Sequence, residues 1–207
     1  MNFLNLSTYW KMKKRAGKVG LLRLYEVLRQ VEDQHAGLDA HLVGHSFRGR
    51  LVTNVRKGPD DRPVLTINSL TLLQAALSHN GFAENFIDQR DGFFRSIVSE
   101  QRVIGPVLIT HTKNDKAVGL AYPLASRINS DDAAAIGDKD DSFGGIGRNG
   151  AQHTPEAINQ HLQSHDKTYL FDNGGYYNLQ ADDFIANHGD VSNLAVANLV
   201  VNAVAAV

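Results

Sequence analysis

Hydrophobic residues recur along this chain with two different spacings, and each spacing predicts a different kind of element. Within 17–35 the large aliphatic residues lie three or four positions apart, with charged and amide residues between them: Leu21, Leu24, Leu28 and Val31. This spacing places them on one face of an amphipathic helix. Further helices are predicted over 47–57, 91–99, 122–128 and 191–204. Another helix is predicted to start at Thr154-Pro155, because threonine is a favoured N-cap and proline a favoured first helical residue.

Short apolar runs predict the strands. Residues 40–43, 69–76 and 107–111 are rich in aliphatic residues, and two later candidates lie at 169–171 and 176–179. The run 107–111 is short, β-branched and apolar, as expected for a strand that is buried on both faces. Strands that alternate with helices predict an α/β fold, in which helices flank a parallel sheet. A chain of 207 residues is expected to form one such domain.

The composition excludes several classes of function but does not assign one. The net charge is −1, and 43% of the residues are hydrophobic, as in an ordinary globular protein. Residues 1–57 carry eleven Lys and Arg against four acids, which we interpret as a solvated helix face because no nucleic-acid-binding motif accompanies it. The absence of cysteine excludes disulfides and thiol nucleophiles. Neither a signal peptide nor an apolar run of about 20 residues is present, so we expect a cytoplasmic protein without a membrane partner.

The clearest chemical signal is the segment Gly44-His45-Ser46-Phe47-Arg48. A predicted strand leads into it, and a predicted helix begins at Phe47. A sharp turn between a strand and a helix lifts a serine hydroxyl clear of a sheet, an arrangement called the nucleophile elbow. The elbow pattern is Gly-x-Ser-x-Gly, and Arg48 replaces its last glycine here.

Ser46 needs partner side chains to act as a nucleophile. A serine hydroxyl becomes reactive when a base takes its proton and an acid orients that base. Asp115 lies four residues after the end of the strand 107–111, and His188 lies just before the last predicted helix. His79 also follows a predicted strand and is an alternative base. Because parallel strands present their carboxyl ends at one edge of a sheet, we expect these residues to converge there.

With these residues identified, the chain resembles the α/β-hydrolase-fold serine hydrolases from residue 38 to the C-terminus. The resemblance rests on 43–47, on 109–115, on 188–190 and on the chain order serine, acid, histidine. It implies that Ser46 is the nucleophile, His188 the general base and acid, and Asp115 the orienting acid.

The resemblance also implies that the backbone N–H of Phe47 is an oxyanion donor. His45 and His79 are then candidate pocket residues. The implied reaction is hydrolysis of a carboxylic ester or related acyl bond of a small-molecule substrate. It requires no cofactor and no metal.

Two features depart from the pattern of this family. The side chain of Arg48 must reach solvent, pair with an acid or displace the helix, because the elbow favours a small residue there. Only 45 residues precede Ser46, and they are mostly helical in pattern, so the strands and the loop that supplies a second oxyanion donor are not found upstream. These departures predict an N-terminally incomplete domain whose exposed apolar edge strand favours self-association. They also support an alternative function, a catalytically impaired hydrolase-like binding protein.

Three other motifs carry less weight. Residues 145–150 fit Gly-x-Gly-x-x-Gly, but no predicted strand precedes them. Residues 138–149 match a calcium-binding loop only in part, because the required glycine and the terminal glutamate are replaced. His161 and His165 lie four apart on a predicted helix, without the glutamate of a zinc protease. None of these motifs predicts a metal or a cofactor.

Overall fold

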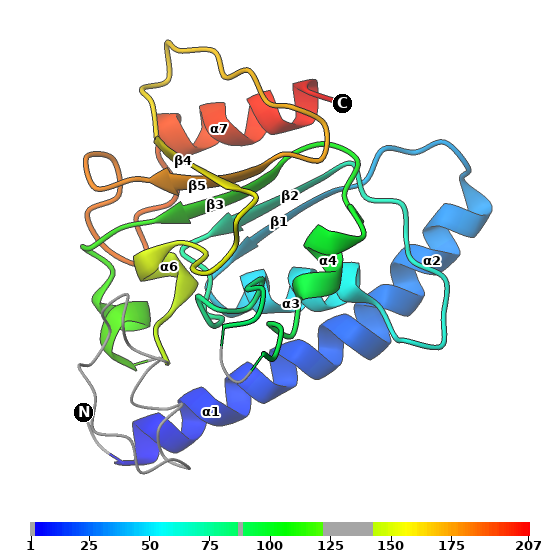
Figure 1. Cartoon of the computed structure of the whole chain (residues 1–207), viewed down its shortest axis with the longest axis horizontal. Coiled ribbons are helices and arrows are strands. Elements are labelled where there is room, and N and C mark those ends of the chain that lie inside the picture. The colour runs from blue at the N-terminus through cyan, green and yellow to red at the C-terminus, as the bar shows by residue number, and fades with distance from the viewer. Residues whose placement is uncertain (1–2, 87–88, 122–142) are drawn as a thin grey trace.

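A computed structural model describes residues 3–86, 89–121 and 143–207 (Figure 1). Its elements are α1 (Phe3–Lys18), the π-helical η1 (Val19–Leu24), α2 (Tyr25–Gln34), β1 (His41–His45), α3 (Phe47–Lys57), β2 (Ser69–Leu73), α4 (Arg95–Ser99), β3 (Val107–His111), the π-helical η2 (Ala117–Ala121), α6 (Ile146–Asn149), β4 (Ala157–His161), β5 (Tyr176–Gln180) and α7 (Leu194–Ala205). The helix predicted over 122–128 lies outside the described residues. None of the helices within the described ranges has the length and hydrophobicity needed to cross a bilayer.

The five strands form one parallel sheet in the order β1-β2-β3-β5-β4, which confirms the predicted α/β class. α7 covers one face of the sheet, α3 and α4 lie on the other, and α1 packs against α3 (Figure 1). Leu72 and Ile109 belong to the core cluster on the α3 side, whereas Leu73 and Leu108 belong to the cluster on the α7 side. Because both faces of β2 and β3 are buried, each strand carries three aliphatic residues of its five, and these residues point to both faces.

Most predicted elements are confirmed, with shifts at some ends: the strands at 40–43, 69–76, 107–111 and 176–179, and the helices at 47–57 and 191–204. The strand β2 ends early because Gln74 adopts a φ of 44°, which interrupts the extended backbone. The predicted helix 91–99 is present only as the shorter α4. The predicted helix 17–35 is the second half of a longer helical segment that begins at Phe3.

The helix predicted to start at Thr154 is wrong. Residues 157–161 form the strand β4, which pairs with β5 in parallel register, and His161 and His165 therefore do not share a helix face. The Thr154 hydroxyl donates a hydrogen bond to Gln152 O, so it does not cap a following helix. The backbone of β5 offers hydrogen-bond partners to residues 157–161. A capping signal is local and carries no information about these partners, so the segment forms a strand despite the helix signal before it.

The strand predicted at 169–171 is also wrong. This segment is a loop whose aromatic rings pack against the α7 side of the sheet, with Tyr169 stacked on Phe171 and Phe171 against Tyr177. The backbone N–H of Tyr169 donates to Asn202 Oδ1 on α7. The aromatic residues that suggest a strand in the sequence serve this packing instead.

β1 forms one edge of the sheet. The Ser46 N–H donates to Leu73 O on β2, and alternate residues of a strand direct their backbone groups to the same neighbour. Counting back from Ser46, Val43 therefore directs its N–H and C=O toward the open edge. The Val43 side chain is also exposed. An unpaired edge of this kind favours addition of another strand.

If β1 mediates self-association, Val43→Pro is expected to keep the protein monomeric at concentrations at which the wild type forms dimers. Proline removes the outward N–H and is tolerated on an edge strand. Sedimentation velocity over a concentration series measures the effect. Val201→Ser is the control, because it removes an exposed apolar side chain from α7 and leaves β1 unchanged. A wild type that is monomeric throughout, or a Val43→Pro dimer, would contradict this expectation.

Candidate active site

Ser46 occupies a strained turn between β1 and α3. Its backbone has a φ of 56° and a ψ of −126°, which is uncommon for a residue with a side chain. Three backbone hydrogen bonds hold it: the Ser46 N–H donates to Leu73 O, and the Ser46 carbonyl accepts from the N–H groups of Gly49 and Ala76. A strained residue of this kind persists only where its surroundings fix it. The serine hydroxyl is thereby raised at the carboxyl ends of the strands.

α3 comes close to β1 at Gly44, and it comes close to the segment after β2 at Gly49. A Cβ at Gly44 would lie 2.6 Å from Arg48 O, and one at Gly49 would lie 2.5 Å from the Cβ of Ala75. The side chain of Arg48 is exposed instead. Arg48 was expected to reach solvent, to pair with an acid or to displace the helix, and the structure shows that its side chain reaches solvent. The turn therefore accommodates arginine where the elbow pattern has glycine.

Gly49→Ala is expected to lower the free energy of unfolding by about 1–3 kcal/mol, because the added methyl group forces α3 away from Ala75. Gly17→Ala is a matched control within α1, where the nearest atom to a new Cβ is Arg50 Nε at 3.4 Å, on a flexible side chain. This second change is expected to be neutral or to stabilise by about 0.5–1 kcal/mol. Urea denaturation measures both, and equal effects of the two substitutions would show that the close contact is unimportant.

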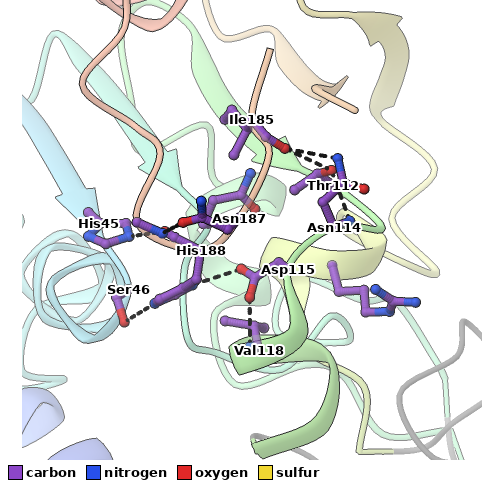
Figure 2. Close-up of polar contacts among 12 residues, drawn as sticks. His45, Ser46, Thr112, Asn114, Asp115, Val118, Ile185, Asn187 and His188 are labelled. Carbon is purple, nitrogen blue, oxygen red and sulfur yellow. Dashed lines mark hydrogen bonds and ion pairs between the residues drawn. The ribbon is translucent and has the colours of Figure 1, made fainter. Parts of the chain in front are cut away.

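His188 lies between Ser46 and Asp115 (Figure 2). Its Nε2 is 2.8 Å from Ser46 Oγ, and its Nδ1 is 2.8 Å from Asp115 Oδ2. The loop between β5 and α7 carries His188, so the contact with Ser46 joins residues that are far apart in the chain. The His188 carbonyl also accepts a hydrogen bond from His45 Nε2 at 2.7 Å. His45, directly before Ser46, thus holds the loop that carries His188.

The carboxylate of Asp115 is fully buried. Its Oδ1 accepts the Val118 N–H at 2.8 Å, while Oδ2 contacts the His188 ring. Both oxygens therefore have partners, and the orientation of the carboxylate toward His188 is fixed. A buried carboxylate in this position favours a proton on Nδ1 of the histidine and leaves Nε2 able to accept the proton of Ser46.

A second set of contacts joins the loops that carry Asp115 and His188. Thr112 Oγ1 and the Lys113 N–H both donate to Asp182 Oδ1, and Asn114 Nδ2 donates to the carbonyls of Asp182 and Ile185. Burial raises the pKa of Asp182, but hydrogen bonds from Gln180, Thr112 and Lys113 outweigh it and lower that pKa to about 2. Sequence reasoning missed these positioning residues, because the only local signal was that they follow predicted strands.

His79 is not part of this arrangement. It is buried, its Nδ1 accepts a hydrogen bond from Asn149 Nδ2 at 3.1 Å, and its ring packs against Gly144. The residues that line the cavity at Ser46 do not include it. The segment 143–150, which contains α6, covers His79, and this contact could not be predicted from the sequence. The structure thus places His45, but not His79, beside the candidate catalytic residues.

A cavity of about 410 Å³ opens at Ser46, between the N-terminal helical segment and the start of α3. Its lining residues are Met12, Arg15, Ala16, Val19, Ser46, Phe47, Arg48 and Leu51. A larger groove of about 980 Å³ lies along α7 and does not include Ser46. Both volumes are in the range that accommodates small molecules, and the smaller cavity is the candidate substrate site because Ser46 lines it.

Within the described ranges, no cluster of three or more histidine or acidic side chains is placed to hold a metal ion.

No protein-family model matches the chain, and no curated protein or solved structure matches it. The structure shows a parallel α/β fold in which Ser46, His188 and Asp115 lie together at the carboxyl ends of the strands.

Proposed function

We propose that this protein is a serine hydrolase of the α/β-hydrolase type, which cleaves a carboxylic ester or a related acyl bond. The observation that carries the proposal is the chain of hydrogen bonds from Ser46 Oγ through His188 to the buried carboxylate of Asp115. The strained backbone at Ser46 and the order serine, acid, histidine along a parallel sheet support the same interpretation.

In the proposed reaction His188 Nε2 accepts the proton of Ser46 Oγ while the oxygen attacks the acyl carbon. Asp115 stabilises the imidazolium that forms, without becoming protonated itself. His188 then donates the proton to the departing alcohol, and the ester bond breaks to leave an acyl-enzyme. A water molecule, deprotonated by His188, hydrolyses that acyl-enzyme and restores Ser46.

The developing oxyanion is assigned to the N-terminus of α3. Phe47 is the first residue of α3, so its backbone N–H lies at the positive end of the helix dipole. In this type of hydrolase a loop upstream of the elbow supplies a second donor. The described residues upstream of β1 are helical from Phe3 to Gln34, and no such loop is found among them. Lack of one donor typically lowers turnover by roughly 10²–10³-fold, so activated esters are the suitable first substrates.

A fluorophosphonate probe tests the proposal, because it forms a covalent adduct only with an activated serine. We expect labelling of the wild type, with the adduct located on Ser46 by peptide mass spectrometry, and no labelling of Ser46→Ala. Folded wild-type protein that does not react, or Ser46→Ala that reacts equally, would contradict the proposal. The helical segment upstream of β1 favours one alternative, a hydrolase-like binding protein. That alternative predicts ligand binding without labelling.

A further inference from the structure

Two arginines from different elements line the cavity that contains Ser46. Arg15 is on α1, and Arg48 is in the first turn of α3. Both side chains are exposed, and neither has a hydrogen-bond or ion-pair partner among the described residues. A guanidinium presents several donors and keeps its charge at every physiological pH, so these two side chains are available to bind an anionic group in the cavity.

The helices around the cavity supply no compensating negative charge. α1 carries five Lys and Arg and α3 carries four, and neither helix contains Asp or Glu. Burial, and to a smaller extent the charge of Arg50, lower the pKa of Lys13 on α1 to about 7. A cleft lined with charge of one sign attracts ligands of the opposite sign. The field at the entrance to Ser46 therefore favours an anion.

The remainder of the cavity wall is apolar. Met12, Ala16 and Val19 come from the N-terminal helical segment, and Phe47 and Leu51 come from α3. A pocket that combines apolar walls with a few polar groups fixes the orientation of a ligand through those groups. The lining therefore suits a molecule that has a short apolar chain and one charged group.

Resting on the proposed hydrolase function, we propose that the substrate of this protein is an ester that carries a carboxylate or phosphate group, and that Arg15 and Arg48 bind this group. Guanidinium groups form paired hydrogen bonds with both anions. The anionic group takes no part in the reaction: the ester bond breaks, water supplies the new C–O bond, and the anion stays on its chain. Arg48, which departs from the elbow pattern, is then a residue that determines specificity.

Two matched esters test the kinetic part of the proposal. The 4-nitrophenyl ester of hexanoic acid is neutral, and the mono-4-nitrophenyl ester of adipic acid has the same chain length with a terminal carboxylate. We expect wild-type kcat/KM to be at least about tenfold higher for the adipate ester, through KM. Arg15→Gln and Arg48→Gln should each lower this ratio by about tenfold. Arg23→Gln, an exposed arginine outside the cavity, should preserve it.

Binding to Ser46→Ala separates this proposal from the proposed reaction, because binding requires no chemistry. Isothermal titration of Ser46→Ala with adipate, and in parallel with hexyl phosphate, is expected to show binding that weakens about tenfold with each arginine substitution. A preference for one ligand identifies carboxylate or phosphate as the natural group. If adipate binds through Arg15 and Arg48 but neither ester is cleaved, the hydrolase function fails and the anion site stands. Equal cleavage of both esters, or no arginine-dependent binding, overturns the anion site.

Discussion

Replacing either Ser46 or His188 by alanine is expected to lower kcat for an activated ester by roughly 10⁶-fold, and replacing both is expected to lower it no further. The two side chains act as one unit, because Ser46 Oγ lies 2.8 Å from His188 Nε2 and attack requires that His188 accept its proton. Once either member is lost, the other has no function in the reaction. Such non-additivity distinguishes a catalytic pair from two residues that affect stability independently.

Single-turnover and steady-state rates with a 4-nitrophenyl ester measure this effect, and thermal unfolding of each variant shows whether the fold is retained. His35→Ala is the matched control, since His35 is exposed at the end of α2. Ser46 and His188 effects that simply add would show that the two residues do not act on one proton transfer. A Ser46→Ala variant with wild-type turnover would remove the serine mechanism altogether.

Replacing Asp115 by asparagine is expected to lower kcat by about 10⁴-fold while leaving the fold intact. The amide can keep its oxygen toward the Val118 N–H, which now lies 2.8 Å from the carboxylate, so the backbone contact survives. The amide nitrogen then faces His188 Nδ1 and donates to it. His188 must consequently carry its proton on Nε2, where it cannot accept the proton of Ser46.

A pH profile separates this effect from a change in packing. Because the asparagine variant disfavours the reactive tautomer, its rate should rise when hydroxide can replace the histidine as base, so activity should recover partly at strongly alkaline pH. Asp172→Asn is the matched control, because Asp172 is an exposed acid in the loop before β5, at the amino end of that strand. Retention of full activity in Asp115→Asn at neutral pH would show that Asp115 does not orient His188.

The strand and helix around Ser46 are predictable because their patterns are local. The apolar run before Gly44 lies within β1, which ends at His45, and Gly58 ends α3 with a positive φ of 69° and its N–H bonded to Asn54 O. The order in which the strands pair is not predictable in the same way. The segment of β4 follows Thr154-Pro155, which is a local helix signal, whereas β4 forms through contacts with β5.

The sequence alone determined which residue types follow which strands, and so it identified Ser46, Asp115 and His188 as candidates. The spacing of apolar residues indicates which face of each element is buried, and this spacing located the strands that these three residues follow. Only the tertiary structure brought His188 to Ser46 and joined the loops of Asp115 and His188 through the hydrogen bond between Asn114 and Asp182.

The effect of Arg48 on the turn was likewise evident only from the tertiary structure. In the sequence it is a departure from a motif that requires a small residue. In the structure the close approach falls on its neighbours Gly44 and Gly49, and Arg48 reaches the same cavity as Arg15. A linear pattern records spacing along one element, whereas the space around a side chain depends on the elements packed beside it. For that reason the sequence determined the elements and the candidate residues, and the packing of α1 against α3 determined what surrounds Ser46.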